Sequence, residues 1–371
     1  MTGGLPECDT GRMWEERAYR ARRDITALAA SGLSVSTLHA EAIRIIGRDI
    51  SSELTCWATI DPGSLVISTM TNGETRIPSQ FEPLLADAEY SPREPHTFAS
   101  MAKRKEALTR MSDLAITEQD SSARYRNVWR PLGVNQEVRV LFDCGGACWG
   151  GAGIVRAGMD FTSRELEYLA AIAPAVAGAT RMAVRSELSG GESRVAPAIV
   201  LLDSRGSLRS ATPEAKLWEE QVDEGDPGRF LLMMRIMARG ARGAVAGGFR
   251  ATVRDGRGGW AVMQASVLIG DDSDDVAVSI APARGERLTS MLLAAYGLSP
   301  RECEVCLEVM SGHPTATIAQ RLFVSPNTVQ DHLKSIFLKV GVRSRGELVA
   351  RLSPTQGSAP AEFLQTKRET G

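Results

Sequence analysis

Apolar residues near the end of the chain recur at the spacing of a helix. From Ser325 to Val342 one helical face is apolar, which is the pattern of an amphipathic helix that buries one side: Val329, Leu333, Ile336, Phe337, Val340. Ser325 suits the N-cap, Pro326 suits the first turn, and Gly341 supplies a stop. The pattern therefore predicts a helix over about 326–340 with a polar face free for another role.

Two further helices are predicted just before this one. Ser299, Pro300 and Glu302 form a capping box with proline in the first turn of a helix that continues to about residue 310. A short helix follows over 315–323, and a turn leads into the 325 helix. A short helix, a turn and a longer helix make a helix-turn-helix unit, so the segment 285–352 is predicted to be all helical.

The segment 12–187 alternates helices and strands. A charged helix is predicted over 13–32 and a second helix over 36–50, and a strand pair over 55–70 turns at Asp61-Pro62-Gly63. A polar, proline-broken middle carries no clear pattern. A glycine-rich strand pair over 137–158 and a long helix over 161–188, capped by Thr162 or Ser163, close the segment.

A second, smaller segment spans 195–284 after a short flexible joint at 189–193. A strand, turn and strand are predicted over 197–212, a helix over 228–244, and further strands within 249–270 and 274–283. About four strands in so short a segment predict a small α+β unit. The tail 353–371 is rich in proline and glycine and is predicted to be disordered.

Composition places the chain among ordinary globular proteins. Its 371 residues are 43% hydrophobic and 24% charged, enough for two or three domains. The net charge of -2 argues against a basic surface over the whole chain, so a nucleic-acid site has to be local. No apolar run approaches the roughly 20 residues of a membrane span, and the N-terminal segment has no apolar signal core, so we expect a cytoplasmic protein that does not contact membranes.

The six cysteines favour packing over chemistry. Cys303 and Cys306 form a CxxC inside a helical pattern with no second ligand pair nearby, so we interpret them as buried thiols. Cys144 and Cys148 are flanked by glycines and look more exposed, which leaves a redox or metal role open for them. We predict no metal site and no bound cofactor.

The run from Leu298 to Val349 resembles the LuxR-type helix-turn-helix of bacterial transcription regulators. The matching positions are spread over about 55 residues: Leu298, Pro300, Arg301, Glu302, Ile318, Ala319, Leu322, Ser325, Thr328, Val329, His332, Lys339, Gly341, Val342. The resemblance implies a DNA-binding regulator whose helix at about 326–340 lies in the major groove of double-stranded DNA. By the same resemblance Gln330, Asp331 and Lys334 reach into the groove. Ser325, Thr328 and His332 match positions that touch or support the backbone contacts.

The chemistry of these side chains agrees with that role except at one position. Lys334 can donate to guanine or to a phosphate, and Gln330 can pair with adenine. Asp331 departs from the small or neutral residue usual in the family, and a carboxylate near phosphates is repulsive unless it accepts from cytosine N4. Residues 299–352 carry seven Lys or Arg against five acids. So small an excess favours binding as a homodimer.

The two segments before this domain resemble sensor folds. The segment 12–187 is similar to a GAF domain in its strand order, its Trp149-Gly150-Gly151 stretch and its long terminal helix. The segment 195–284 resembles a PAS-like fold through the stretch 200–215 and the later strand that bears a tryptophan. The predicted fold class is therefore α+β sensor domains, GAF-like and then PAS-like, followed by an all-α helix-turn-helix domain. The resemblance implies promoter DNA and RNA polymerase as partners, and a small-molecule ligand in the GAF-like or PAS-like domain.

Other classes of protein lack their expected motifs. The sequence has no GxxxxGK loop of an ATP-driven regulator, no aromatic and aspartate cluster of an acyl-homoserine-lactone receptor, and no receiver-like acidic cluster. Haem and iron-sulfur patterns are not evident either. Two alternatives remain: a constitutive regulator whose N-terminal domains only dimerise, and an enzyme with a targeting tail.

Overall fold

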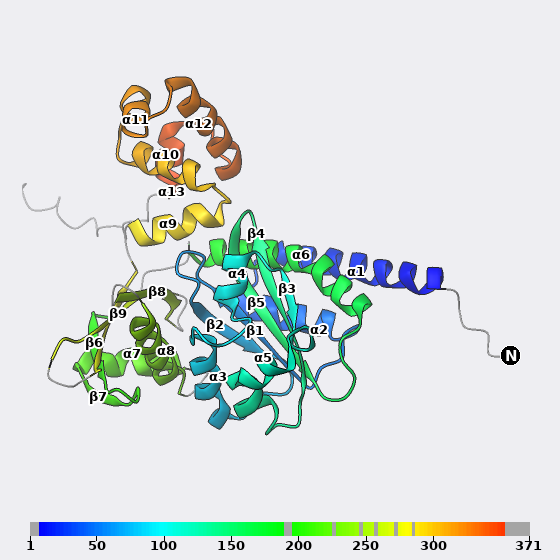
Figure 1. Cartoon of the computed structure of the whole chain (residues 1–371). Helices are drawn as coiled ribbons and strands as arrows, with labels where there is room; N and C mark the ends of the chain where they lie inside the picture. Colours follow the sequence, from blue (N-terminus) through cyan, green and yellow to red (C-terminus); the bar gives the residue numbers. More distant parts are fainter. Residues whose placement is uncertain are drawn as a thin grey trace, which may run out of the picture. The chain divides into compact units, whose positions relative to one another are not determined.

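A computed structural model describes residues 7–188, 195–224, 228–244, 248–255, 259–270, 274–283 and 286–352 (Figure 1). The chain divides into two compact units, Met1–Ala283 and Arg284–Gly371. The predicted joint at 189–193 and the predicted tail at 353–371 lie outside the described residues.

The first sheet of the first unit is antiparallel, with strand order β2-β1-β5-β4-β3 among the residues described. Its strands are β1 (Leu54–Ile60), β2 (Ile67–Asn72), β3 (Leu108–Arg110), β4 (Gln136–Cys144) and β5 (Ala147–Arg156). Both predicted strand pairs are confirmed as β1 with β2 and β4 with β5. The Asp61 carboxylate accepts from the Gly63 N–H and the Ser64 hydroxyl, which fixes the turn between β1 and β2.

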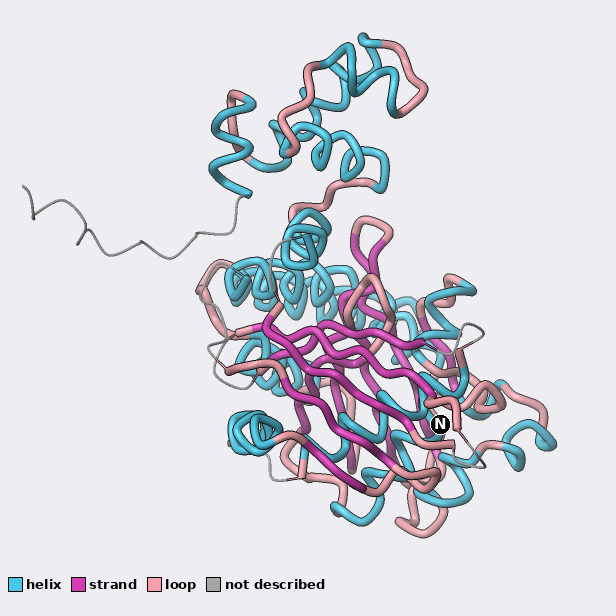
Figure 2. Tube along the Cα trace, turned by 90° about the vertical axis from the view of Figure 1, so that its left-hand side faces the viewer, coloured by secondary structure: helices cyan, strands magenta, loops and turns pink. Residues whose placement is uncertain are grey.

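One face of this sheet is covered by α2 (Val35–Ile46) and α6 (Ser163–Leu188), and α1 (Glu7–Ala29) packs on these two helices. The sequence predicted all three helices. Figure 2 shows helices (cyan) packed beside the strands (magenta) of the unit. Trp57 of β1 and Phe142 of β4 pack there at a tilt, with ring centroids 4.8 Å apart. His39 of α2 packs on Trp57 and hydrogen-bonds the Thr180 hydroxyl at 2.9 Å. Burial lowers the pKa of His39 to about 3, so it is a neutral core residue.

The opposite face carries short elements that the sequence pattern did not predict. These are two 3-10 turns, η1 (Ser79–Phe81) and η2 (Met111–Asp113), a π-turn, η3 (Tyr125–Trp129), and the helices α3 (Glu82–Glu89), α4 (Phe98–Arg104) and α5 (Ile116–Ser121). Buried ion pairs hold them: Arg124 with Glu94 and Glu137, and Arg139 with Glu89. Such partners are distant in sequence, and so no local periodicity marks them.

A second antiparallel sheet in the same unit has the order β7-β6-β10-β9-β8 in the part of the chain described. It comprises β6 (Ala198–Leu202), β7 (Leu208–Ala211), β8 (Gly248–Arg254), β9 (Trp260–Val267) and β10 (Val276–Pro282), and α7 (Pro213–Asp223) and α8 (Arg229–Gly243) pack on it. The prediction of about four strands and a single helix was too low. The stretch 249–270 contains two strands, and Asp255 and Gly259 hydrogen-bond each other between them: the Asp255 N–H donates to the Gly259 carbonyl, and the Gly259 N–H donates to the Asp255 carboxylate.

The two sheets touch within the first unit. The Thr252 N–H of β8 donates to Asp61 at 3.2 Å, and the Arg229 guanidinium of α8 donates to the Ser68 carbonyl at 3.0 Å. Val66, which precedes β2, packs into the core of the second sheet. The GAF-like and PAS-like resemblances, and the boundary between those two segments, stay predictions.

The second unit is helical, as predicted. Its helices are α9 (Glu286–Ala295), α10 (Pro300–Met310), α11 (Thr315–Arg321), α12 (Pro326–Val340) and α13 (Arg345–Leu352). They enclose one apolar core: Leu293, Leu298, Val305, Cys306, Val309, Ile318, Ala319, Val329, Leu333, Ile336, Val340, Leu348, Leu352. In the described part of the whole chain, no helix is both long and apolar enough to cross a membrane.

Candidate nucleic-acid interface

Helix α12 begins and ends where its sequence predicts. The Ser325 hydroxyl accepts from the Thr328 N–H at 3.1 Å, and Pro326 occupies the first turn. Gly341 closes the helix in the left-handed conformation, with φ of 74°. Local sequence therefore sets the length of the helix independently of the rest of the fold.

The apolar stripe of α12 is buried as predicted. Val329, Leu333, Ile336 and Val340 lie in the core of the second unit, and Phe337 is half-buried at its edge. Ala319 of α11 is buried in the same core, and the Val324 N–H donates to its carbonyl at 3.0 Å. This small residue and the bond next to it hold the turn between α11 and α12 close, which fixes the crossing of the two helices.

The opposite face of α12 is exposed and polar. Gln330, Asp331 and Lys334 are all exposed. The Lys334 ammonium lies 3.0 Å from Asp331 in a pair whose side chains are 78% and 74% exposed, so the pair adds little to stability.

Of the remaining predicted residues, Ser325 and Thr328 lie together at the start of α12. Their hydroxyls are 2.8 Å apart, and both residues are exposed. His332 is half-buried. The structure thus places all six predicted residues on one helix, three in the exposed patch and three near its start or flank.

Helix α12 is also tied to its neighbours through Thr315 at the start of α11. The Thr315 hydroxyl accepts from the Gln330 amide at 3.4 Å and from the Arg345 guanidinium at 2.7 Å. Arg345 also donates to the His313 carbonyl at 3.1 Å. One hydroxyl therefore joins α11, α12 and α13 beside the exposed face.

Glu302 holds α12 from the other side, which our sequence analysis did not predict. Its carboxylate accepts from the Ser299 N–H, the Ser335 hydroxyl and the Lys339 ammonium, each at 2.6 Å. Burial alone would raise the pKa of Glu302, but the hydrogen bonds from Lys339, Ser335 and the backbone lower it to about 2. The sequence identified Glu302 only as the N3 residue of a capping box that begins at Ser299. The LuxR-type pattern contains both Glu302 and Lys339, but it did not indicate that their side chains meet.

Two large apolar side chains stand exposed on this part of the unit. Leu338 lies one turn after Lys334 on the outer face of α12 and is 84% exposed. Phe323, in the turn before α12, is 95% exposed and has φ of 55°, an uncommon backbone conformation for a bulky residue.

The positive charge of this unit is largely neutralised within it. Four of the seven cations in 299–352 lie in ion pairs: Arg301 with Glu304, Arg321 with Glu308, Lys334 with Asp331, and Lys339 with Glu302. The structure therefore supports the expectation of a modest electrostatic contribution to DNA binding from a single copy.

The family comparison agrees with this geometry. Residues 297–352 match the family model described as "Bacterial regulatory proteins, luxR family". The C-terminal residues form a LuxR-type helix-turn-helix domain. The match begins just before α10 and ends with α13.

Part of the chain is similar to two mycobacterial proteins. The chain is 43% identical over 79 residues to "Putative HTH-type transcriptional regulator Mb0914c" of Mycobacterium bovis, and equally to "Putative HTH-type transcriptional regulator Rv0890c" of Mycobacterium tuberculosis. The matched segment is 21% of this chain and 9% of each relative. The chain therefore covers about a tenth of the length of these relatives.

The cysteines of the pairs Cys303/Cys306 and Cys144/Cys148 differ in how deeply they are buried. Cys306 is buried in the helical core, and burial raises its thiol pKa to about 12, as expected of a packing residue. Cys148 of β5 is also buried, and burial raises its pKa to about 11, whereas Cys144 of β4 is half-buried. Among the described residues no three His, Cys, Asp or Glu side chains are grouped as metal ligands would be.

Proposed function

We propose that this protein is a bacterial transcriptional regulator that binds promoter DNA by placing α12 in the major groove. The observation that carries the proposal is a helix with capped ends, a buried stripe and an exposed polar face, held on both sides by Glu302 and Thr315. A LuxR-type domain of this kind supports DNA binding, and the relatives' printed names describe transcriptional regulators.

The exposed face supplies the groups that read bases. Lys334 donates to guanine O6 and N7, Gln330 pairs with adenine, and Asp331 accepts from cytosine N4. Ser325 and Thr328, at the helix start, lie where hydroxyls and backbone N–H groups meet a phosphate, and His332 supports that contact. Leu338 extends the same face with an apolar side chain suited to a thymine methyl group.

The N-terminal sheets modulate this activity as GAF-like and PAS-like sensors, in a homodimer that works with RNA polymerase. Two antiparallel sheets with helices packed on them favour a sensor architecture. The alternative of a constitutive regulator is distinguished by native mass spectrometry of gently purified protein. A retained small molecule favours the sensor.

Selection of DNA sites from a random pool by the full chain tests the proposal. We expect enrichment of a pseudo-palindromic motif by the natural protein, and loss of the motif with the triple variant Gln330→Ala/Asp331→Ala/Lys334→Ala. These three side chains are exposed, so the variant keeps its fold, which circular dichroism checks. No enriched motif, or the same motif from the variant, would refute the proposal.

A further inference from the structure

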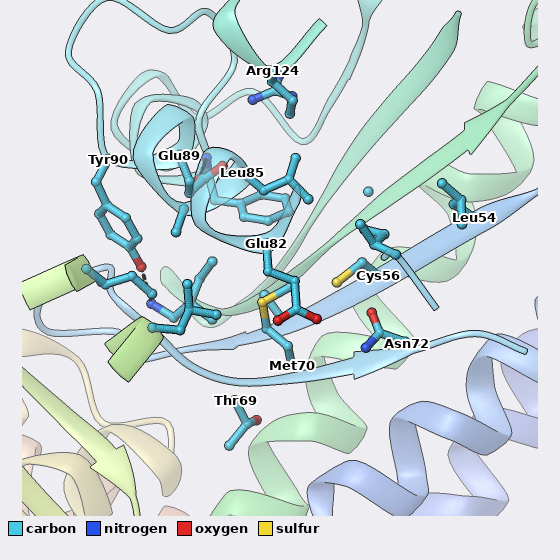
Figure 3. A pocket seen from close by; sticks show the side chains of 18 of the residues that line it. Leu54, Cys56, Thr69, Met70, Asn72, Glu82, Leu85, Glu89, Tyr90 and Arg124 are labelled. Carbon is cyan, nitrogen blue, oxygen red and sulfur yellow. Dashed lines mark hydrogen bonds between the residues drawn. The ribbon is translucent and has the colours of Figure 1, made fainter. Parts of the chain in front are cut away.

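The first unit contains a cavity between its first sheet and the helices α3 and α8, with a volume of about 140 Å³ (Figure 3). Leu85, Glu89 and Tyr90 come from α3 and its end, and Cys56 and Met70 come from β1 and β2 opposite. An apolar cavity of roughly this size can hold a single aromatic ring.

The walls of the cavity are mainly apolar and come from both layers of the unit. Ala58 and Gly153 lie on the sheet, and Met233 and Ile236 of α8 form part of the opposite wall. Helix α8 packs on the second sheet. A molecule in the cavity therefore touches elements of both sheets at once.

The cavity lining contains buried hydrogen-bond donors that have no acceptor. Arg139 donates to Glu89 at 2.7 Å, but its Nε and one terminal nitrogen have no hydrogen-bond partner although the side chain is only 6% exposed. The indole N–H of Trp129, also buried, has no partner either. Such buried donors cost free energy until an acceptor meets them.

The carboxylates on the lining are already paired with arginines. Glu89 pairs with Arg139 at 2.7 Å, Glu137 with Arg124 at 3.0 Å, and Glu82 lies 3.7 Å from Arg76. The Cys56 thiol stays protonated, because burial raises its pKa to about 12. The lining thus offers unsatisfied donors and no unpaired anion among the residues described.

We propose that the cavity binds a small molecule with one aromatic or branched apolar body and a carbonyl or carboxylate oxygen, which accepts from Arg139 and Trp129. This inference rests on the proposed sensor function and specifies its ligand class. A ligand there also contacts α8, so it stabilises the arrangement of the two sheets. The second sheet precedes the DNA-binding unit in sequence, which gives ligand binding a route to regulation.

Fluorine NMR of the full chain with four matched probes tests the ligand class. The probes are 4-fluorobenzoate, 4-fluorobenzamide, fluorobenzene and 4-fluorobenzylamine. We expect the two probes with an acceptor oxygen to bind most tightly and the amine to bind least. Equal or tighter binding of 4-fluorobenzylamine, or no binding of any probe at millimolar concentration, would overturn the proposal.

Two variants locate the binding. At Gly153 a Cβ would meet no heavy atom closer than 4.0 Å, so Gly153→Val fills cavity space on a strand that tolerates a β-branched residue. We expect it to weaken all probes by at least about tenfold. Gly178→Ala in α6, where a Cβ meets nothing within 4 Å, is the matched control and should bind normally. Unchanged binding to a folded Gly153→Val protein would place the site elsewhere.

The acceptor contact has its own variant. Arg139→Met combined with Glu89→Gln removes the donor without leaving a buried charge, and we expect about a 10- to 150-fold loss for 4-fluorobenzoate with little change for fluorobenzene. An equal loss for both probes would mean that Arg139 is only structural. If neither variant folds, the four-probe comparison on the natural protein still decides the class.

Hydrogen exchange with and without 4-fluorobenzoate tests the contact with α8. Slower exchange in both β1 and α8 is expected, and slowing in β1 alone would overturn the bridging of the two sheets. Binding of DNA by the protein without any probe is measured in parallel. If DNA binding fails, the proposed function fails; if only the probes fail, the ligand inference alone is wrong.

Discussion

The carboxylate of Glu302 joins two helices that the sequence presents as separate elements. It caps α10 through the Ser299 N–H and holds α12 through Ser335 and Lys339. A helix that reads DNA has to keep its angle to the domain, because a small rotation moves every side chain on its outer face. One buried anion with three donors provides that rigidity.

Glu302→Gln should lower the free energy of unfolding of the helical unit by about 1–3 kcal/mol, since it weakens three hydrogen bonds to a buried charge. Urea unfolding of residues 284–352, followed by circular dichroism, measures this. Glu304→Gln is the matched control, because Glu304 is two residues away and half exposed, and it should change stability by less than about 0.5 kcal/mol. Equal effects of the two substitutions would contradict the anchoring role of Glu302.

The same residue predicts an acid-sensitive domain. The pKa of Glu302 is about 2 in the folded protein against an ordinary 4.5, so its stabilisation is present above about pH 4.5 and is lost as the pH falls towards 2. The loss is on the order of 3 kcal/mol. Stability of the unit measured from pH 6 to pH 2 should fall more steeply in the natural sequence than in Glu302→Gln. If the stability of the natural sequence and that of Glu302→Gln fell in parallel with pH, a group other than Glu302 would be responsible for the acid sensitivity.

Lys334 tests the exposed face one residue at a time. Because Lys334 is 78% exposed and pairs with the exposed Asp331, Lys334→Ala should leave the fold unchanged. If Lys334 reads a base, the substitution weakens binding to the true site by about 1–3 kcal/mol and relaxes preference at one position. A phosphate contact instead weakens binding to all sequences evenly and reduces the salt slope by about one. We expect base reading, and titration against specific and scrambled DNA at several salt concentrations distinguishes the two.

Asp331→Asn is the companion variant. It releases Lys334 from the intrahelical pair and removes a charge that repels phosphates, so we expect tighter binding to scrambled DNA and a smaller ratio of specific to nonspecific affinity. Unchanged binding by both variants would show that this face does not read DNA.

At the scale of elements, the helical unit should fold alone. Its core closes within 293–352, and α10 and α12 carry their own caps. The fragment 284–352 should give a helical circular dichroism spectrum and a cooperative thermal transition. A spectrum without helix would contradict this prediction.

Local signals explain which elements could be predicted. The helix α12 follows from its cap, its proline, its stripe and its glycine, all within the segment itself. The hairpins follow from alternating apolar residues around a turn. In the middle of the first unit, α3 and η3 were not predicted, because the ion pairs Arg139–Glu89 and Arg124–Glu137 tie them to β4 of the sheet. No neighbouring residue reports such contacts.

The candidate site divides in the same way. Sequence placed Gln330, Asp331 and Lys334 on the exposed face, which needs only helical periodicity. It did not reveal the contact of Glu302 with Ser335 and Lys339, because that contact depends on how α10 and α12 cross. The Thr315 contacts, which join three helices, depend on the fold in the same manner.

For the whole molecule, charge and symmetry set the expected mode of binding. The chain carries a net charge of -2, and ion pairs neutralise much of the helical unit, so one copy has limited attraction for DNA. A two-fold dimer doubles the contacts and requires two half-sites about one helical turn apart. We therefore expect a pseudo-palindromic operator.

Methylation interference on the selected DNA site tests the central claim most directly, because methylation at guanine N7 blocks the major groove. We predict interference at guanines in two half-sites about 10 base pairs apart, and loss of one guanine position per half-site with Lys334→Ala. Binding that tolerates guanine N7 methylation throughout the site, or an interference pattern that Lys334→Ala leaves unchanged, would contradict recognition by α12.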